Sequence, residues 1–144
     1  MAKILAVDDD PRIRRFVSQT LKAGGHEVTA VEDAESAIVQ LLTGRPDLFL
    51  LDINLPGMHG LELARKLKSQ KGTESIPVVI LSVRTDPRDK VAAFASGALT
   101  YLEKPFKKED LLDAVKTALH ITRKRKGRAI PRPPPADSSP APST

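Results

Sequence analysis

The sequence predicts an α/β protein in which a doubly wound, five-stranded parallel sheet is covered on both faces by five helices. Short apolar runs alternate with segments whose apolar residues recur at helical spacing, five times along the chain. Two of the runs, residues 48–51 and 78–81, are apolar at every position, which is typical of strands buried on both faces. Strict alternation requires crossover connections and therefore favours parallel strands.

The strands can be placed in order. We expect them at residues 3–7, 26–31, 47–52, 77–82 and 98–102. The second is more polar than the others, which predicts a position at an edge of the sheet. A doubly wound sheet in the order 2-1-3-4-5 sets the first and third strands side by side at the switch point, where ligands bind.

The first two helices have clear starts or stops. Asp10-Pro11 is an N-cap followed by the residue that suits the first helical position, and Gly24-Gly25 ends the first helix. The second helix is expected to stop before Gly44 and Pro46. Its apolar stripe consists of Ala34, Ala37, Ile38, Leu41 and Leu42.

The remaining helices follow from the same spacing. Pro56-Gly57 prevents the third from starting before about residue 59. A weaker fourth helix is expected over residues 87–96. The apolar stripes are Leu61, Ala64 and Leu67 for the third helix, Val91, Phe94 and Ala95 for the fourth, and Leu111, Leu112, Val115, Ala118 and Leu119 for the fifth.

Composition excludes several classes of protein. At 144 residues the chain is one domain by length, and its 40% apolar content fits a globular core. An aromatic content of 3% argues against a nucleic-acid stacking platform. The absence of cysteine excludes disulfides, thiol nucleophiles and zinc-thiolate sites. No run is long enough for a signal peptide or a membrane span, so we expect a cytoplasmic protein.

Charge divides the chain into two parts. Residues 1–122, the expected globular domain, carry 17 basic and 17 acidic residues. Residues 123–144 carry six basic residues and one acidic, and form a basic and then Pro-rich tail or linker. The run Arg123, Lys124, Arg125 and Lys126 complements the dipole of the last helix, or else makes a weak contact with nucleic acid, an anionic membrane surface or an acidic partner.

Polar residues gather where the strands end. Asp8 and Asp9 follow the first strand, Asp52 ends the third, Ser82 ends the fourth and Lys104 follows the fifth. Carboxyl ends of parallel strands meet at one edge, so these side chains should line one crevice. Three carboxylates there repel each other unless a cation intervenes. A donor set of oxygens alone, with no cysteine and no histidine pair, favours Mg²⁺.

The chemistry centres on Asp52. A carboxylate beside Mg²⁺, an ammonium group and a hydroxyl is suited to accepting a phosphoryl group, because such transfer needs mainly positioning and charge neutralisation. Taken alone, Asp52 also fits a turn-forming or helix-capping aspartate.

Over about residues 1–121 the sequence resembles the receiver domain of bacterial two-component response regulators, in the single-domain, chemotaxis-regulator-like form with a flavodoxin-like fold. The matching motifs are Val7-Asp8-Asp9, Asp52 with Pro56-Gly57 behind it, Leu81-Ser82, and Tyr101-Leu102-Glu103-Lys104-Pro105-Phe106. Each motif is weak alone, but together they stand in the family's order at the expected strand ends.

The resemblance implies roles for individual residues. Asp52 is the phosphoacceptor, and Asp8 or Asp9, with Asp52 and the main-chain carbonyl of Asn54, holds Mg²⁺. Lys104 contacts the phosphoryl group, and its peptide bond to Pro105 is cis. Ser82 and Tyr101 form the conformational switch.

The resemblance also implies partners. The phosphodonor is a phosphohistidine on a sensor histidine kinase or phosphotransfer protein, and an output protein, which the sequence does not identify, reads the face formed by the fourth helix, fifth strand and fifth helix. The protein is then a regulated binding module and not a turnover enzyme.

Two departures from the family pattern stand out. Val83 follows Ser82 where the family usually has Ala or Gly, which predicts a crowded mouth of the phosphoryl pocket and slower dephosphorylation or weaker uptake. Leu99-Thr100 replaces a commonly acidic pair, so Leu99 is either a buried strand residue or part of a docking face. The three histidines, His26, His59 and His120, lack metal-ligand spacing and are expected to be surface or satisfied side chains, with His59 nearest the crevice.

Two rival functions remain. A pseudo-receiver would use the same fold for docking without phosphorylation. An aspartyl phosphatase of the haloacid dehalogenase type would place its nucleophile among Asp8, Asp9 and Asp10, but Pro11 and Arg12 stand where that motif requires other residues.

Overall fold

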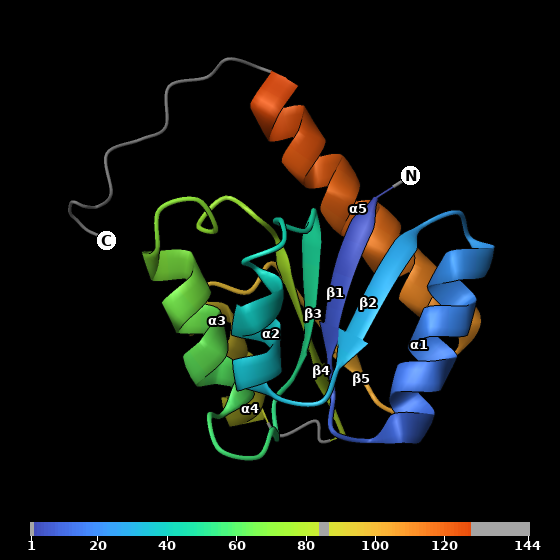
Figure 1. Ribbon diagram of the computed structural model, residues 1–144, viewed down its shortest axis with the longest axis horizontal. Helices are drawn as coiled ribbons and strands as arrows, with labels where there is room; N and C mark the ends of the chain where they lie inside the picture. The colour runs from blue at the N-terminus through green and yellow to red at the C-terminus, as the bar shows by residue number, and fades with distance from the viewer. Residues whose placement is uncertain (1, 84–86, 128–144) are drawn as a thin grey trace.

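The computed structural model describes residues 2–83 and 87–127, with the backbone alone for residues 123–127 (Figure 1). Five strands alternate with five helices along the described chain: β1 Lys3–Val7, α1 Pro11–Ala23, β2 Glu27–Val31, α2 Ala34–Gln40, β3 Leu48–Asp52, α3 Gly60–Ser69, β4 Val78–Ser82, α4 Pro87–Ala95, β5 Thr100–Glu103 and α5 Lys108–Gly127. The sheet has the order β2-β1-β3-β4-β5 and every pairing is parallel, which confirms the predicted architecture.

The sheet separates two apolar layers. Figure 1 shows α1 and α5 on one side of the sheet and α2 and α3 on the other. Alternate residues of β1 serve the two layers: Leu5 and Val7 pack toward α2, α3 and α4, whereas Ile4 and Ala6 pack toward α1 and α5. Both layers are therefore closed by helices that follow directly from the sequence pattern.

The middle and the edges of the sheet differ in burial. All five residues of β3 and all five of β4 are buried, as their uninterrupted apolar runs predict. At the edges, β2 is partly or fully exposed along its length and β5 is partly exposed. The predicted edge position of β2 is confirmed, and the polar ends of the central strands, Asp52 and Ser82, lie at the carboxyl edge of the sheet.

Side-chain caps start the first two helices. A carboxylate oxygen of Asp10 accepts a hydrogen bond from the Arg12 backbone N–H at 2.8 Å, and Asp33 accepts one from Ser36 at the same distance. Hydrogen bonds from Arg12 lower the pKa of Asp10, and the Ser36 backbone bond lowers that of Asp33. Both aspartates are thus held in the ionised form that caps a helix best.

The predicted apolar stripe of α2 is too long. The helix ends at Gln40 and Leu42 is 85% exposed. Residues 41–43 turn away because their N–H groups bond carbonyls three residues back and the Thr43 hydroxyl also donates to the Gln40 carbonyl. Gly44, at φ 149°, completes a bend that apolar spacing alone does not reveal.

The predicted stripe of α4 faces the wrong way. Val91 and Phe94 are 69% and 53% exposed, and the buried residue of the helix is Ala93. A small side chain at the contact lets the helix lie close to its neighbours, which leaves the larger residues on the outer side. Leu99, by contrast, is partly buried and packs against the core layer on the α1 and α5 side.

Helix α5 is longer than expected. It continues to Gly127, so the basic run 123–126 lies inside its last turns, across the domain boundary set at residue 122. Arg and Lys favour helix, and the first breaker is Gly127. The Pro-rich part of the tail, residues 128–144, lies outside the described residues, and the weak anionic contact stays a prediction. No described helix has the length and hydropathy to cross a bilayer.

Candidate functional site

The predicted residues meet at the carboxyl edge of the sheet. Asp8 directly follows β1, Asp52 ends β3, Ser82 ends β4 and Lys104 directly follows β5. Strands β1, β3, β4 and β5 are adjacent in the sheet and parallel. The four residues therefore lie together at the carboxyl ends of these strands.

An ammonium group joins the two buried carboxylates. Lys104 Nζ donates to Asp8 Oδ2 at 2.6 Å and to Asp52 Oδ1 at 3.2 Å. The three side chains are 11%, 3% and 5% exposed respectively, so water screens these contacts little. Lys104 is therefore paired with both acids at once, across 96 and 52 positions of the chain.

The buried cluster raises the pKa of both Asp52 and Lys104. Burial raises the pKa of Asp52, and the charge of Asp8 raises it further, although Lys104 works in the opposite sense. Burial by itself would lower the pKa of Lys104, but its hydrogen bond to Asp8 and the charge of Asp52 outweigh this and the pKa is raised. The contact with Lys104 therefore does not cancel the effect of burial and of Asp8 on the pKa of Asp52.

The carboxylates fit a hard divalent cation. One oxygen from each of Asp8, Asp9 and Asp52 lies within 4.8 Å of the others, close to the roughly 4 Å that separates opposite ligands around Mg²⁺. Asp8 and Asp52 are buried and Asp9 is exposed, which leaves one side open to water or a phosphoryl group. Burial and the charge of Asp8, which together raise the pKa of Asp52, are a second reason that a cation fits here.

Two contacts that the sequence did not reveal orient Asp8. Its Oδ1 accepts a hydrogen bond from the Asp10 backbone N–H at 2.9 Å. Its main-chain carbonyl accepts one from Arg14 Nη1 on α1 at 2.8 Å. The Asp8 carboxylate is thus held between the start of α1 and Lys104, and an arginine one turn into a helix gives no sequence signal for such a role.

The loop after Asp52 is pinned at both ends. The Gly60 N–H donates to the Ile53 carbonyl at 2.8 Å, and a Cβ at residue 60 would lie 1.9 Å from the Asp52 carbonyl oxygen. His59 caps α3, because its Nδ1 accepts from the Leu61 N–H at 3.2 Å. A glycine at a helix start was the available signal for this close approach, and it was missed.

The proposed switch residues lie on neighbouring strands. Ser82 is 2% exposed and Tyr101 is half-buried. In the β4–β5 register, Tyr101 pairs with Ile80 and Ser82 pairs with Glu103. The Lys104 N–H donates to the Ser82 carbonyl at 2.6 Å, and the Lys104-Pro105 bond is cis, as the family resemblance implies.

The remaining sequence candidates lie at the rim. Asn54 is exposed at the start of the loop that follows Asp52. Val83 is 58% exposed and directly follows buried Ser82, so its side chain lies at the surface near the carboxyl edge of the sheet. The three residues after Val83 fall outside the described part of the chain.

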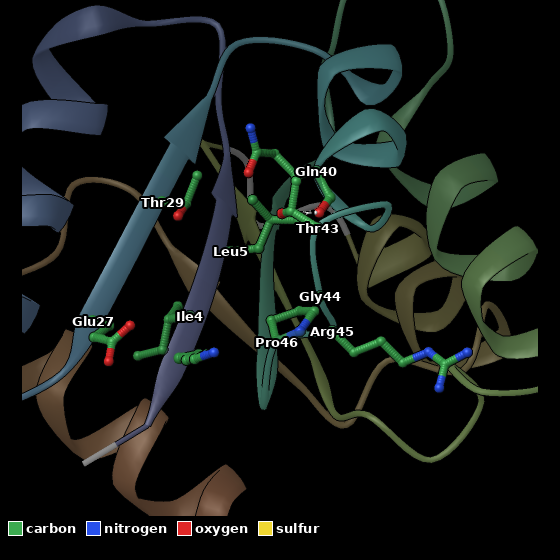
Figure 2. Close-up of a pocket in the computed structure, with 10 residues that line it drawn as sticks. Ile4, Leu5, Glu27, Thr29, Gln40, Thr43, Gly44, Arg45 and Pro46 are labelled. Carbon is green, nitrogen blue, oxygen red and sulfur yellow. Dashed lines mark hydrogen bonds between the residues drawn. The ribbon is translucent and has the colours of Figure 1, made fainter.

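The cavity in Figure 2 lies elsewhere. It measures about 160 Å³ and sits at the amino ends of β1 and β2, the opposite edge of the sheet from Asp8 and Asp52. It lies beside the last residue of α2 and the bend that follows the helix. Its lining residues are Lys3, Ile4, Leu5, Glu27, Thr29, Gln40, Thr43, Gly44, Arg45 and Pro46.

Known proteins with similar sequences are response regulators. A family model described as the response regulator receiver domain matches residues 4–116. The DNA-binding response regulator MtrA of Mycolicibacterium smegmatis is 38% identical over 117 residues, 81% of this chain and 50% of that protein. The two-component response regulator PhoP of Pseudomonas aeruginosa is 42% identical over 109 residues, 76% and 48% respectively. The chain thus spans about half the length of these curated relatives.

Solved structures show the same fold. The chemotaxis response regulator CheY4 of Vibrio cholerae superimposes with a TM-score of 0.78 at 36% identity, over 82% of this chain and 98% of that one. A response regulator structure from Chloroflexus aurantiacus gives a TM-score of 0.80 at 32% identity, over 83% and 98%.

Proposed function

Because the chain belongs to the family of response regulator receiver domains, we propose that it is a phosphorylation-controlled signalling switch whose phosphoacceptor is Asp52. The observation that supports this most directly is the contact of one ammonium group, on Lys104, with both Asp8 and Asp52. It brings a buried nucleophile and a cation for the phosphoryl oxygens to one point at the carboxyl edge of the sheet.

The proposed reaction is a transfer between two proteins. An Asp52 oxygen forms a bond to phosphorus while the bond from phosphorus to a donor imidazole nitrogen breaks, and the electron pair stays on that nitrogen, which takes up a proton. Lys104 turns from Asp52 toward the incoming phosphoryl oxygens, and the Ser82 hydroxyl donates to one of them. We propose a sensor histidine kinase or phosphotransfer protein as the donor, in the cytoplasm.

Receiver domains bind Mg²⁺ at an acidic pocket, and here Asp8, Asp9, Asp52 and the main-chain carbonyl of Asn54 would hold it. When bound, Mg²⁺ supplies positive charge against the phosphoryl oxygens. The roles of the chain's own residues are to orient Asp52, through the pinned loop at Gly60, and to hold Asp8 through Arg14.

Phosphorylation would then change a surface. It converts one negative charge at Asp52 to nearly two and adds acceptor oxygens. Ser82 moves toward them, Tyr101 turns inward, and the face of α4, β5 and α5 changes for an output partner. We propose that the protein acts as a binding module and not as a turnover enzyme.

The test is intact mass after incubation with a small phosphodonor and Mg²⁺. We expect the wild type to gain one phosphoryl group and Asp52→Asn to gain none, and we expect chelation of Mg²⁺ to abolish the gain. Asp113→Asn is the matched control, because Asp113 is an exposed aspartate on α5 and should behave as wild type.

Other results would favour the rivals. No gain in the wild type would support a docking module that works without phosphorylation. Hydrolysis of a generic phosphomonoester that survives in Asp52→Ala would support an aspartyl phosphatase instead.

A further inference from the structure

One side chain of α4 contacts two residues of β5. Lys90 Nζ lies 3.3 Å from Glu103 Oε1 and 5.8 Å from the centre of the Tyr101 ring. Tyr101 and Glu103 are two positions apart in the strand, so their side chains project from the same face. The ammonium group therefore makes an ion pair and a cation–π contact at the same time.

Helix α4 buries little apolar surface against the rest of the domain. Its buried residue is Ala93, while Val91 and Phe94 are mostly exposed. Ala92 also packs against the core but is only partly buried, so α4 gains little from apolar burial. The contacts of Lys90 with Glu103 and Tyr101 add a specific attachment of α4 to β5.

We propose that Lys90 is a latch that holds the Tyr101 ring in its present position and so sets the balance of the switch before phosphorylation. This rests on the proposed function. Lys90 acts as a positioning residue: it touches neither Asp52 nor a phosphoryl group, and it regulates the readout of the site through Tyr101 and Glu103.

The latch is connected to the site by the backbone. Glu103 directly precedes Lys104, whose N–H bonds the Ser82 carbonyl and whose ammonium group bonds Asp52. A movement of Ser82 and Lys104 toward a phosphoryl group displaces Glu103 as well, and this pulls on the contact with Lys90. Phosphorylation and release of Tyr101 are therefore coupled through one strand end.

The expected size of the effect is modest. The ion pair is about half exposed, with 44% of Lys90 and 41% of Glu103 accessible, and exposed pairs and cation–π contacts are individually weak. We expect removal of Lys90 to shift the equilibrium between the two positions of Tyr101 by about three- to tenfold.

The chain offers a clean reporter. Tyr101 is its single tyrosine and it has no tryptophan, so ultraviolet emission excited at wavelengths that phenylalanine does not absorb reports on this ring alone. Acrylamide quenching of Tyr101 is measured on the full chain with and without a small phosphodonor and Mg²⁺, in wild type, Lys90→Gln, Lys90→Arg, Glu103→Gln and Lys116→Gln. Phosphorylation is followed in parallel by intact mass.

We expect unphosphorylated Lys90→Gln to shift toward the quenching of the phosphorylated wild type. Glu103→Gln, which keeps the ammonium group but breaks the ion pair, should shift less. Lys90→Arg, which keeps charge and ring contact, and the exposed control Lys116→Gln should match wild type.

The two proposals fail in different ways. If the wild type is phosphorylated and its Tyr101 quenching changes, but Lys90→Gln matches wild type in both states, the latch is wrong and the proposed function stands. If Asp52 of the wild type takes up no phosphoryl group, or does so with no change at Tyr101, the switch on which the latch acts does not exist and the latch falls with it.

Discussion

Gly60 lies so close to the Asp52 carbonyl that any side chain at residue 60 would collide with the backbone of the proposed acceptor, a Cβ meeting its oxygen at 1.9 Å. The first turn of α3 is thereby seated on the end of β3, and the intervening loop is fixed at both ends. Gly60 is required for space and not for an unusual φ angle, since its φ is not positive.

Replacement of Gly60 by alanine should therefore disturb both fold and site. We expect Gly60→Ala to lower the free energy of unfolding by about 3 kcal/mol or more, because backbone has to move. Gly57→Ala is the control: φ there is +74° with nothing within 4 Å, so strain alone should lower it by about 1–2 kcal/mol. Urea denaturation followed by circular dichroism measures both, and equal losses would contradict the seating of α3 on Asp52.

Asp52→Asn should stabilise the metal-free protein at neutral pH. The raised pKa of Asp52 means that its ionisation opposes folding. Protonation of Asp52 instead stabilises the folded state. This contribution is complete below the unfolded-state pKa of 3.8 and is lost as pH rises through the folded-state pKa of Asp52. We expect the variant to be more stable by roughly 1 kcal/mol at pH 7 and equal to wild type below pH 3.8. Stability measured against pH in chelator checks this, and a variant less stable than wild type at pH 7 would contradict it.

Lys104→Met should destabilise strongly, because it leaves two buried carboxylates without their ammonium group. We expect the free energy of unfolding to fall by about 3 kcal/mol, which is at the lower end of the range for breaking a buried ion pair. Addition of Mg²⁺ should restore part of this stability. The raised pKa of Lys104 gives stability that is present below 10.5 and lost as pH rises beyond it, so this alkaline loss should be missing in the variant. Unfolding with and without Mg²⁺ measures the first effect, and a pH series to the alkaline side measures the second.

Val83→Ala tests the crowding of the crevice mouth. Val83 is 58% exposed next to buried Ser82, so a smaller residue opens access without creating a cavity in the core. We expect phosphoryl uptake and hydrolysis to become faster by about three- to tenfold, a barrier change of roughly 1 kcal/mol. Intact-mass time courses with a small phosphodonor measure both rates, with Val39→Ala, an exposed valine on α2, as the control. Unchanged rates of uptake and hydrolysis would show that Val83 does not restrict access to Asp52.

Much of the fold was predictable because strand and helix periods alternate cleanly and the central strands are apolar throughout. Two helices were misjudged for a physical reason. The α2 and α4 segments contain apolar residues at helical spacing, but tertiary contacts decide which of them are buried. In α4 the small residue Ala93 is buried while the larger Val91 and Phe94 are exposed.

The site was predictable where topology alone brings residues together, as with Asp8, Asp52 and Lys104 at adjacent strand ends. It was not predictable where a single long side chain decides the contact. The reach of Arg14 to the Asp8 carbonyl and of Lys90 over Tyr101 depends on rotamers and on the helix position, and neither leaves a pattern in the sequence.

The pairing of Lys104 with Asp8 and Asp52 gives this domain an internal counter-ion. A divalent cation held by Asp8, Asp9 and Asp52 would take over part of the charge that Lys104 now balances, and the ammonium group would then be available to an anion at the same edge of the sheet. The acidic cluster thus has a positive charge of the chain's own beside it, whether or not a metal ion is bound.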